Sequence, residues 1–246
     1  MRLKNKTAIV TGGASGFGEA IVRRFAEEGA NVMVADVNAD GARYAAEIYG
    51  GVSCTVDVSD RTSVEAMAKL AEHEMGHVDI LVNNAGITHL PQPLEDVTEE
   101  DFDRVFAVNC KSVYLTARAF VPDMKERQTG VILNVASTAG VSPRPKLNWY
   151  NASKGWMNTA TRTLAVELAP MGIRVNAINP VAGETPLLKS FMGEDTPEMR
   201  EKFLATIPLG RFSQPDDMGH AAVYLCSDEA SMGTGGCMEV DGGRCS

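Results

Sequence analysis

A tyrosine and a lysine four positions apart form the pair most suggestive of chemistry. If the segment is helical, Tyr150 and Lys154 lie one turn apart on the same face. The pKa of a free tyrosine is about 10, so proton exchange near neutrality needs its phenolate stabilised by about 4 kcal/mol. A nearby ammonium group lowers the pKa of a phenol in that direction. Ordinary packing beside a solvated amine is the alternative for this pair alone.

Two further polar side chains stand at positions that call for a reason. Ser137 follows the apolar run 131–135, a predicted strand, and open α/β sheets bind ligands at the carboxyl ends of their strands. Its hydroxyl could hold a carbonyl oxygen near the phenol. Asn109 lies on the apolar stripe of a predicted helix, where a buried amide costs a few kcal/mol unless it is hydrogen-bonded. Satisfying a neighbouring backbone bend is the simpler role for Asn109.

A glycine-rich turn precedes the first predicted helix. Residues 11–18 have the sequence TGGASGFG and separate an apolar run from an amphipathic segment. Glycines there permit a tight turn that brings helix N-terminal N–H groups close to a pyrophosphate. Asp36 ends the second apolar run, where a carboxylate can accept hydrogen bonds from a ribose 2′-hydroxyl. These features predict a dinucleotide site, although Asp36 alone could be a strand-end turn residue.

Strand-like and helix-like segments alternate along the whole chain. This alternation predicts an α/β fold with a Rossmann-like, doubly wound parallel sheet of about seven strands. We expect one dinucleotide-binding and catalytic domain over residues 1–246. The expected strands are 7–10, 32–35, 52–56, 79–82, 131–135, 173–178 and 238–240. The expected helices are 17–29, 40–48, 64–75, 98–124, 149–169 and 215–226, the last with Ser213 as its N-cap.

Composition excludes several classes of protein. The chain has 246 residues, 44% of them hydrophobic, and no apolar run approaches the ~20 residues that span a bilayer. A net charge of −9 argues against a nucleic-acid surface, and the N-terminus lacks the pattern of a secretory signal. The five cysteines are scattered without a C-x-x-C pair, which favours reduced thiols in the cytoplasm. His73 and His77 lack a third ligand, so no metal site is expected.

Four motifs in order resemble those of the short-chain dehydrogenase/reductase family. They are the glycine-rich turn, Asn83-Asn84-Ala85-Gly86, Tyr150 and Lys154 with upstream Ser137, and the closing Val240-Asp241-Gly242-Gly243. The likeness runs from about residue 5 to the end. It implies a homotetrameric oxidoreductase that transfers hydride between a nicotinamide and a substrate carbon.

The resemblance implies a role for each catalytic residue. Tyr150 would exchange a proton with the substrate oxygen that Ser137 positions, and Lys154 would lower the tyrosine pKa and bind the nicotinamide ribose. Asn109 would hold a water molecule that relays protons to Lys154. The resemblance also implies these cofactor contacts: Gly12, Ser15, Gly16, Phe17, Gly18, Asp36, Asp57, Val58, Asn84, Ala85, Gly86, Tyr150, Lys154, Pro180 and Thr185.

Two cofactor positions have alternatives. Asp57 is similar to the family aspartate beside the adenine ring, but a lone strand-end aspartate could equally cap a helix. Pro180 and Thr185 fit the family segment after the sixth strand, with Thr185 placed to contact the nicotinamide carboxamide. Val181 departs from that segment's Pro-Gly pattern, and β-branched residues tolerate a positive φ poorly.

Two residues favour NAD over NADP. Family members that prefer NADPH usually carry a basic residue where this chain has Ser15. Asp36 would also repel a 2′-phosphate. We therefore expect NAD as the cofactor.

The expected substrate is a secondary alcohol or its ketone, of the small alcohol, sugar or cyclic polyol type. The pocket should be lined by residues 87–95, 138–149 and a substrate loop at about 184–206. Arg144 and Lys146 in the second segment could meet an anionic or polyhydroxylated substrate, unless they are ordinary exposed cations.

Two other functions remain open. One is a 3-oxoacyl-(acyl-carrier-protein) reductase, although such enzymes usually favour NADPH and an acidic carrier would be repelled by this acidic chain. Lys125 and Arg127 could supply part of a basic patch for it. The other is a noncatalytic NAD-sensing interaction protein, because fold does not determine function. Such a protein would be expected to lack Tyr150 or Lys154, and both are present.

Overall fold

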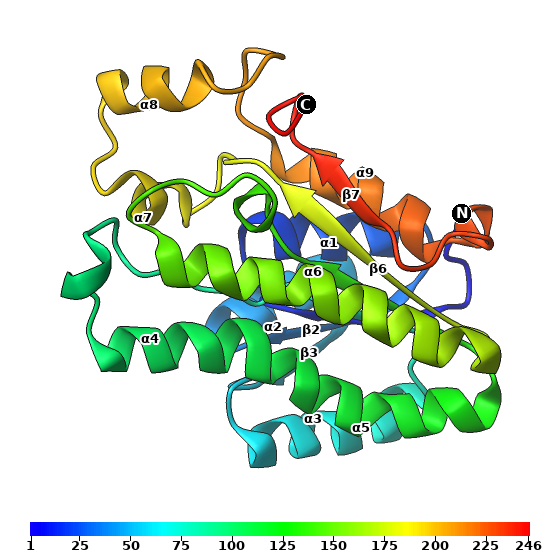
Figure 1. Ribbon diagram of the computed structural model, residues 1–246. Helices are drawn as coiled ribbons and strands as arrows, with labels where there is room; N and C mark the ends of the chain where they lie inside the picture. Colours follow the sequence, from blue (N-terminus) through cyan, green and yellow to red (C-terminus); the bar gives the residue numbers. More distant parts are fainter.

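The computed structural model describes residues 1–246. In it, the apolar runs of the sequence form one parallel sheet (Figure 1). The strand order is β3-β2-β1-β4-β5-β6-β7, and every neighbouring pair is parallel. The strands are β1 (Thr7–Thr11), β2 (Asn31–Asp36), β3 (Val52–Thr55), β4 (Ile80–Asn83), β5 (Gly130–Val135), β6 (Ile173–Pro180) and β7 (Cys237–Val240). The predicted Rossmann-like sheet is confirmed.

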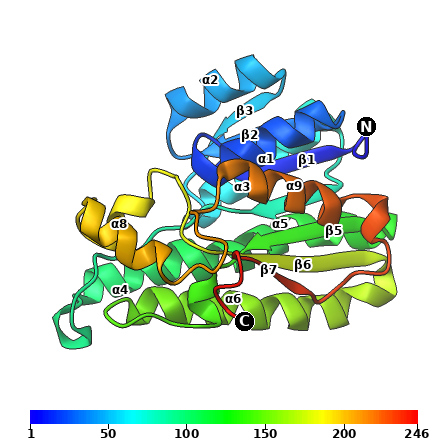
Figure 2. The ribbon, with the colours of Figure 1, turned by 90° about the horizontal axis from the view of Figure 1, so that it is seen from above.

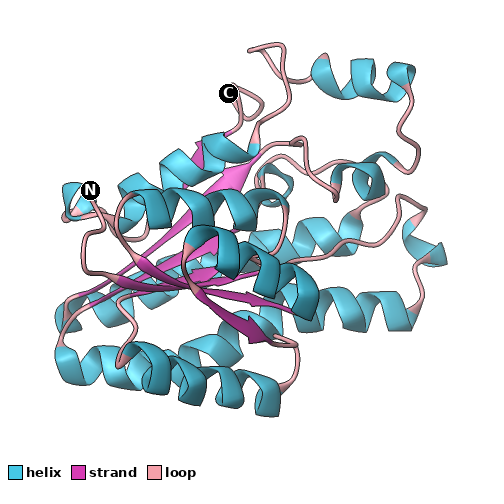
Figure 3. Cartoon of the chain, turned by 180° about the vertical axis from the view of Figure 1, so that it is seen from behind, coloured by secondary structure: helices cyan, strands magenta, loops and turns pink.

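Helices connect the strands and flank the sheet on both sides (Figures 2 and 3). The α-helices are α1 (Gly16–Glu27), α2 (Ala39–Tyr49), α3 (Arg61–Met75), α4 (Glu99–Phe106), α5 (Ser112–Arg127), α6 (Asn148–Leu168), α7 (Leu188–Met192), α8 (Pro197–Leu204) and α9 (Pro215–Cys226). Shorter helical turns are η1 (Leu94–Asp96), η2 (Ala107–Lys111), η3 (Thr138–Gly140), η4 (Ala169–Met171) and η5 (Asp228–Ala230).

Two apolar clusters fill the space between the sheet and its helices. In β1, Ala8 and Val10 pack with α1, α2 and α9, whereas Ile9 packs with α3, α5 and α6. This division follows from the strand period of two, which points successive side chains to opposite faces. All of β1 is buried, and this explains why its sequence lacks polar alternation.

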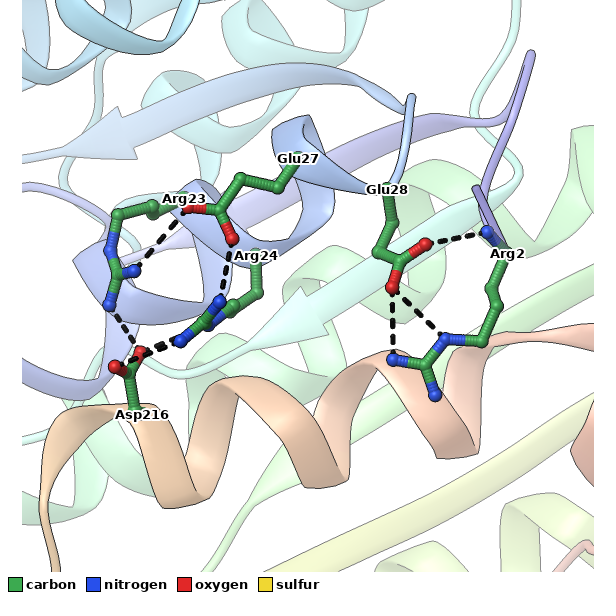
Figure 4. Close-up of polar contacts among 6 residues, drawn as sticks. All are labelled: Arg2, Arg23, Arg24, Glu27, Glu28 and Asp216. Atoms are coloured by element: carbon green, nitrogen blue, oxygen red, sulfur yellow. Dashed lines mark hydrogen bonds and ion pairs between the residues drawn. The ribbon is translucent and has the colours of Figure 1, made fainter.

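Ion pairs fasten α1, the helix after the glycine-rich turn, to α9 (Figure 4). Asp216 of α9 pairs with Arg23 and lies 3.0 Å from the Nη2 atom of Arg24. The hydrogen bond from Arg24 is the main cause that holds the pKa of Asp216 below its ordinary value. At the other end of α1, Arg2 and Glu28 form a second pair at 3.1 Å.

Two predicted helix boundaries were wrong. The helix expected over residues 98–124 is three segments, because the π-helical turn η2 separates α4 from α5. The N-cap of α9 is Gln214 rather than Ser213. The backbone N–H of Gln214 donates to Asp217 Oδ2 at 2.8 Å, while the Ser213 hydroxyl turns back to the Val181 carbonyl at 3.3 Å.

The segment after β6 carries α7 and α8 outward from the sheet, at the upper left of Figure 1. Six buried apolar side chains hold it together: Val181, Leu188, Met192, Phe203, Ile207 and Phe212. None of the protein's helices combines the length and the apolar character needed to cross a membrane. All five cysteines are free.

Candidate active site

A cavity of about 690 Å³ lies at the carboxyl edge of the sheet. Loops that follow β1 to β6 line it, because parallel strands bring their carboxyl ends to one edge. The strand order changes direction between β1 and β4, which is where such sheets form a crevice. Every predicted site residue except Asn109 lines this cavity.

The glycine-rich turn has the conformation that its glycines permit. Gly12 and Gly16 have φ values of 64° and 57°, in the left-handed region. A Cβ atom at Gly18 would lie 1.9 Å from the Gly12 carbonyl oxygen, so only glycine allows this approach. The first-turn N–H groups of α1 have no intrahelical partner, and Ser15, its N-cap, leaves its hydroxyl without a capping hydrogen bond. These donors suit a phosphate group.

The segment after β4 is tied directly to this turn. The Asn84 side chain donates from Nδ2 to the carbonyls of Thr11 and Gly12, at 2.9 and 3.0 Å. The N–H groups of Asn84 and Ala85 donate to Thr11 Oγ1 at 3.0 and 3.1 Å. A Cβ atom at Gly86 would lie 3.3 Å from Lys154 Nζ, so Gly86 leaves room at the centre of the cavity.

Asp36 and Asp57 line the part of the cavity where the sequence predicts the adenosine half of the cofactor. Asp36 accepts hydrogen bonds from the N–H groups of Ala14 and Asn38, at 3.0 and 2.9 Å, and these orient its carboxylate at the cavity wall. Asp57 also lines the cavity, beside the buried Val58. The N-cap of α3 is Asp60, so the capping alternative for Asp57 is wrong.

The loop after β6 adopts a path that suits a β-branched residue. Val181 is not among the residues with positive φ, and its side chain packs into the apolar cluster of α7 and α8. The departure from Pro-Gly therefore requires no strained backbone. Thr185 lies against the glycine-rich turn, since a Cβ atom at Gly16 would be 3.2 Å from Thr185 Cβ. With Pro180, it lines the same cavity.

The predicted proton-transfer residues converge at the centre of the cavity. Tyr150 and Lys154 are buried in the first two turns of α6, 5% and 4% exposed. Lys154 Nζ lies 5.9 Å from the centre of the Tyr150 ring and donates to the Val135 carbonyl at 2.9 Å. Ser137 lines the wall beside them, and its backbone N–H donates to Asn179 Oδ1 at 3.2 Å.

The pKa values of Tyr150 and Lys154 are shifted in the direction opposite to the one that attraction between a phenolate and an ammonium would cause. Burial raises the pKa of Tyr150 to about 12, and the neighbouring Ser137 hydroxyl offsets only part of that effect. Burial also lowers the pKa of Lys154 to about 8. Desolvation of each group therefore outweighs the stabilisation of a phenolate by the ammonium. At neutral pH in this structure, the phenol keeps its proton and most of the lysine is charged.

Asn109 occupies the π turn η2 and is fully buried. Its Oδ1 accepts from the Ile87 N–H at 2.9 Å, and its Nδ2 donates to the Ile87 carbonyl at 2.9 Å and to Ser153 Oγ at 3.0 Å. The simpler role, satisfaction of neighbouring backbone groups, is thus present. A Cβ atom at Gly86 would also lie 3.4 Å from Asn109 Oδ1, so Asn109 stands directly behind the cavity wall.

Two residues at the site were not singled out by sequence reasoning. Phe191, in the segment expected to line the pocket, lies with its ring centre 5.0 Å from that of Tyr150. Asn179 of β6 holds the Ser137 backbone, and its own Nδ2 is buried without a partner. A polar residue at the end of an apolar run was the only sequence signal for Asn179, and Phe191 had none.

The remaining polar residues, His73, His77 and Thr98, contact residues close to them in the sequence. His73 contacts Glu74 at 2.9 Å, and His77 lies 3.4 Å from Asp79. Thr98 caps α4, accepting from the Asp101 N–H at 3.1 Å. None of these side chains lines the cavity.

Known proteins resemble this chain over its whole length. A family model described as enoyl-(acyl carrier protein) reductase matches residues 12–244. The chain is 51% identical to the 4-formylbenzenesulfonate dehydrogenase of Comamonas testosteroni, with 99% of both chains covered. It is 39% identical to the 3-oxoacyl-(acyl-carrier-protein) reductase of Thermotoga maritima, again over 99% of each.

A solved structure shows the same similarity in three dimensions. It is the 3-ketoacyl-(acyl-carrier-protein) reductase of Brucella melitensis complexed with NADH. The TM-score is 0.95 at 48% sequence identity, covering 99% of this chain and 100% of that one.

Proposed function

Because the chain belongs to the short-chain dehydrogenase/reductase family, we propose that it is an NAD-dependent oxidoreductase that interconverts a secondary alcohol and a ketone. The relatives include a dehydrogenase and a reductase by name, and the reductase of Brucella melitensis was solved with NADH. The observation that supports the proposed site best is the convergence of Ser137, Tyr150 and Lys154 on the cavity that holds the glycine-rich turn.

The residues present fit a nicotinamide dinucleotide. Gly12 to Gly18 offer unpaired N–H groups for the pyrophosphate, and Asp36 offers an oriented carboxylate for the adenosine ribose. Lys154 would contact the nicotinamide ribose, and Thr185 its carboxamide. The relative from Brucella melitensis, which was solved with NADH, supports this assignment.

The proposed preference for NAD over NADP rests on charge. Ser15 provides no cation for a 2′-phosphate, and the Asp36 carboxylate would repel one. Nine arginines in the chain form ion pairs, and none of these pairs involves Asp36. The carboxylate therefore keeps its charge available to the 2′-hydroxyl.

The proposed proton transfer occurs at Tyr150. The bound nicotinamide supplies the hydride donor or acceptor. In reduction, the Tyr150 hydroxyl gives its proton to the developing alkoxide, while Ser137 donates a hydrogen bond to the same oxygen. In oxidation, the phenolate takes the proton back, and the charge of Lys154 stabilises that phenolate. Asn109 is proposed to hold a water molecule behind Lys154.

The proposed substrate is small, because α7 and α8 close one end of the cavity. Leu187, Phe191 and Phe203 give that end an apolar wall, and Arg144 adds a charge. We propose that residues 184–206 form the substrate loop of a single domain, 1–246. Five free cysteines support the proposed location of that domain in the cytoplasm.

A 3-oxoacyl-(acyl-carrier-protein) reductase is the alternative that two relatives suggest by name. The cations considered for carrier docking do not support it. Lys125 lies 3.8 Å from Glu167, and Arg127 pairs with Asp79 and Asp123. Both cations end α5, immediately before β5 begins, so they stand at the edge of the sheet opposite the cavity.

An aromatic aldehyde is a second candidate substrate. The relative from Comamonas testosteroni is named for 4-formylbenzenesulfonate, whose reacting group is an aldehyde on a benzene ring. The rings of Phe191 and Phe203 at the cavity wall favour an aromatic substrate of this kind. Oxidation of an aldehyde would proceed through its hydrate, formed with one water molecule. One hydroxyl group of the hydrate would give its proton to Tyr150 while the carbon gives hydride to the nicotinamide, leaving a carboxylic acid.

The proposed function is tested by a substrate screen that follows the absorbance of reduced nicotinamide. The purified protein is incubated with NAD or NADP and secondary alcohols, sugars, cyclic polyols and aromatic alcohols, and with NADH or NADPH and β-ketoacyl thioesters. Turnover of a small alcohol with NAD is expected. Turnover of the thioester alone would favour the reductase, and NAD binding without any turnover would favour the noncatalytic alternative.

A further inference from the structure

Arg144 stands at the substrate end of the cavity on a rigid support. Its backbone carbonyl accepts from Asn151 Nδ2 at 2.7 Å, which ties it to the residue after Tyr150. Its guanidinium lies 4.1 Å from the centre of the Phe203 ring, and Nη2 donates to Thr206 Oγ1 at 2.9 Å. The charge is therefore held against the cavity wall instead of extending into solvent.

Arg244 reaches the same region from the C-terminal tail. Its Nη1 donates to Ser142 Oγ at 3.0 Å, and Ser142 lines the cavity two positions before Arg144. The Nε atom of Arg244 is buried and has no hydrogen-bond partner. A buried N–H group of a cation without a partner is costly, so the Arg244 guanidinium is held here with its charge incompletely compensated.

No carboxylate neutralises these two arginines. Neither forms an ion pair, whereas Arg200 in the adjacent loop pairs with Glu184 and Asp195. The tail carboxylate of Asp241 instead accepts from the N–H groups of Gly243 and Cys245, at 2.9 and 2.7 Å. Burial, followed by repulsion from Arg244, lowers the pKa of Arg144 to about 10, which leaves it charged at neutral pH.

We propose that Arg144 and Arg244 recognise an anionic group on the substrate, and that this chain selects small aromatic acids. Arg144 contacts the oxyanion from the cavity wall, and Arg244 positions Ser142 and adds a second positive charge behind it. The rings of Phe191 and Phe203 supply the apolar surface for the aromatic part. This inference rests on the proposed oxidoreductase function, because it assigns the substrate class of the same cavity.

A purely structural role is the competing account of Arg144. Through Thr206 and Phe203 it joins the loop after β5 to the segment that contains α8. If Arg144 served only to join these two segments, its loss would change the affinity for charged and neutral ligands equally. Recognition of an anion would support only the charged ligand, so a pair of isosteric ligands separates the two roles.

The test is isothermal titration calorimetry on the NADH-saturated protein with benzoate and with benzamide, which share a shape and differ in charge. We expect benzoate to bind at least about tenfold more tightly, as one or two charge-assisted hydrogen bonds provide. Arg144→Gln should remove most of that difference while benzamide affinity stays within about twofold. Arg244→Gln should weaken benzoate binding by about threefold to tenfold.

Lys146→Gln is the matched control, because it removes one positive charge from the same loop at an exposed position outside the cavity wall. It should leave both affinities within about twofold of the wild type. Equal binding of benzoate and benzamide by the wild-type protein would overturn the proposal, and so would an equal loss of both ligands in Arg144→Gln.

Turnover of acetophenone with NADH is measured alongside. If the neutral ketone is reduced but benzoate shows no advantage over benzamide, the proposed function stands and the anion site is wrong. If benzoate shows its advantage but no alcohol or carbonyl compound turns over, the anion site stands and the proposed function is wrong.

Discussion

Burial controls the protonation of the two side chains at the centre of the cavity. Tyr150 and Lys154 are both removed from solvent, and burial shifts the pKa of each in the direction that favours its neutral form. The pKa of the phenol rises and the pKa of the ammonium falls. Lys154 Nζ donates to the Val135 carbonyl and lies 5.9 Å from the centre of the Tyr150 ring, and its attraction for a phenolate is smaller than the cost of burying the phenolate charge. The spacing of the two residues on one helix was visible in the sequence, but the sequence carried no measure of desolvation.

Lys154 should make stability depend on pH in a defined window. Its pKa falls from 10.5 to about 8 on folding, so between these values only the unfolded chain keeps the proton, and stability rises with pH. Below pH 8 the buried charge costs on the order of 3 kcal/mol. Lys154→Met should therefore raise the melting temperature at pH 7, with a gain that shrinks toward pH 10. A gain independent of pH would contradict this account.

Asp36 should decide between the two nicotinamide dinucleotides. Removing its carboxylate removes a hydrogen-bond acceptor for the ribose 2′-hydroxyl and the repulsion of a 2′-phosphate. Asp36→Ala should lower the ratio of kcat/KM for NAD to that for NADP by at least about tenfold. Steady-state kinetics with both cofactors provide the measurement. An unchanged ratio would remove Asp36 from the cofactor assignment.

Whole elements were more predictable than the turns between them. The strand at residues 7–10 and the helix beginning near Phe17 follow from an apolar run and a four-residue repeat. The π turn at Asn109 does not follow from a local pattern, and its side chain bonds to the backbone of Ile87, 22 positions earlier. The N-cap of α9 moved by one residue because Asp217 reaches the Gln214 N–H.

The first turn of α1 should tolerate no side chain at Gly18. A Cβ atom there would lie 1.9 Å from the Gly12 carbonyl oxygen, and this contact is between backbone segments that cannot both relax. Gly18→Ala should destabilise the protein by about 1–3 kcal/mol or more and weaken NAD binding. Denaturant unfolding and cofactor titration test both effects.

Gly155→Ala provides the matched comparison within α6. A Cβ atom there would meet only the Gly140 carbonyl oxygen, at an ordinary 3.6 Å. Because alanine favours a helix interior over glycine by about 1 kcal/mol, this variant should be neutral or slightly more stable. Equal destabilisation by both substitutions would show that the close approach at Gly18 is not the cause.

At the scale of the molecule, α5 and α6 carry exposed apolar side chains on their outer surface. Tyr114 of α5 is 53% exposed, and Trp156 and Val166 of α6 are 38% and 79% exposed. A contiguous patch of exposed apolar side chains marks an interaction surface. They support the homotetramer that we propose for this protein.

Sedimentation should therefore give a mass of four chains. Val166→Lys places a charge on the proposed interface and should shift the protein toward dimers or monomers. Ile48→Lys is the control, because Ile48 is an exposed aliphatic residue of α2, on the other face of the sheet. A monomeric wild-type protein, or an equal shift in both variants, would contradict the assignment.

The substrate end is the part of the molecule least visible in the sequence. Arg144 was recognised as a cation in a pocket segment, but Arg244 lies a hundred positions away and reaches Ser142 only through the fold. The glycine-rich turn and Tyr150 were visible because their spacing is local. Charge recognition at the substrate end depends on which cations lack partners, and this is a property of the folded chain.

The central claim is that Tyr150 exchanges the substrate proton, and Tyr150→Phe tests it most directly. The variant keeps the ring that contacts Phe191 and loses only the buried hydroxyl. With the substrate found in the screen, kcat should fall by at least about a hundredfold, as expected when a general acid is lost, while NAD affinity by titration stays unchanged. A variant that retains near-normal kcat would contradict the account.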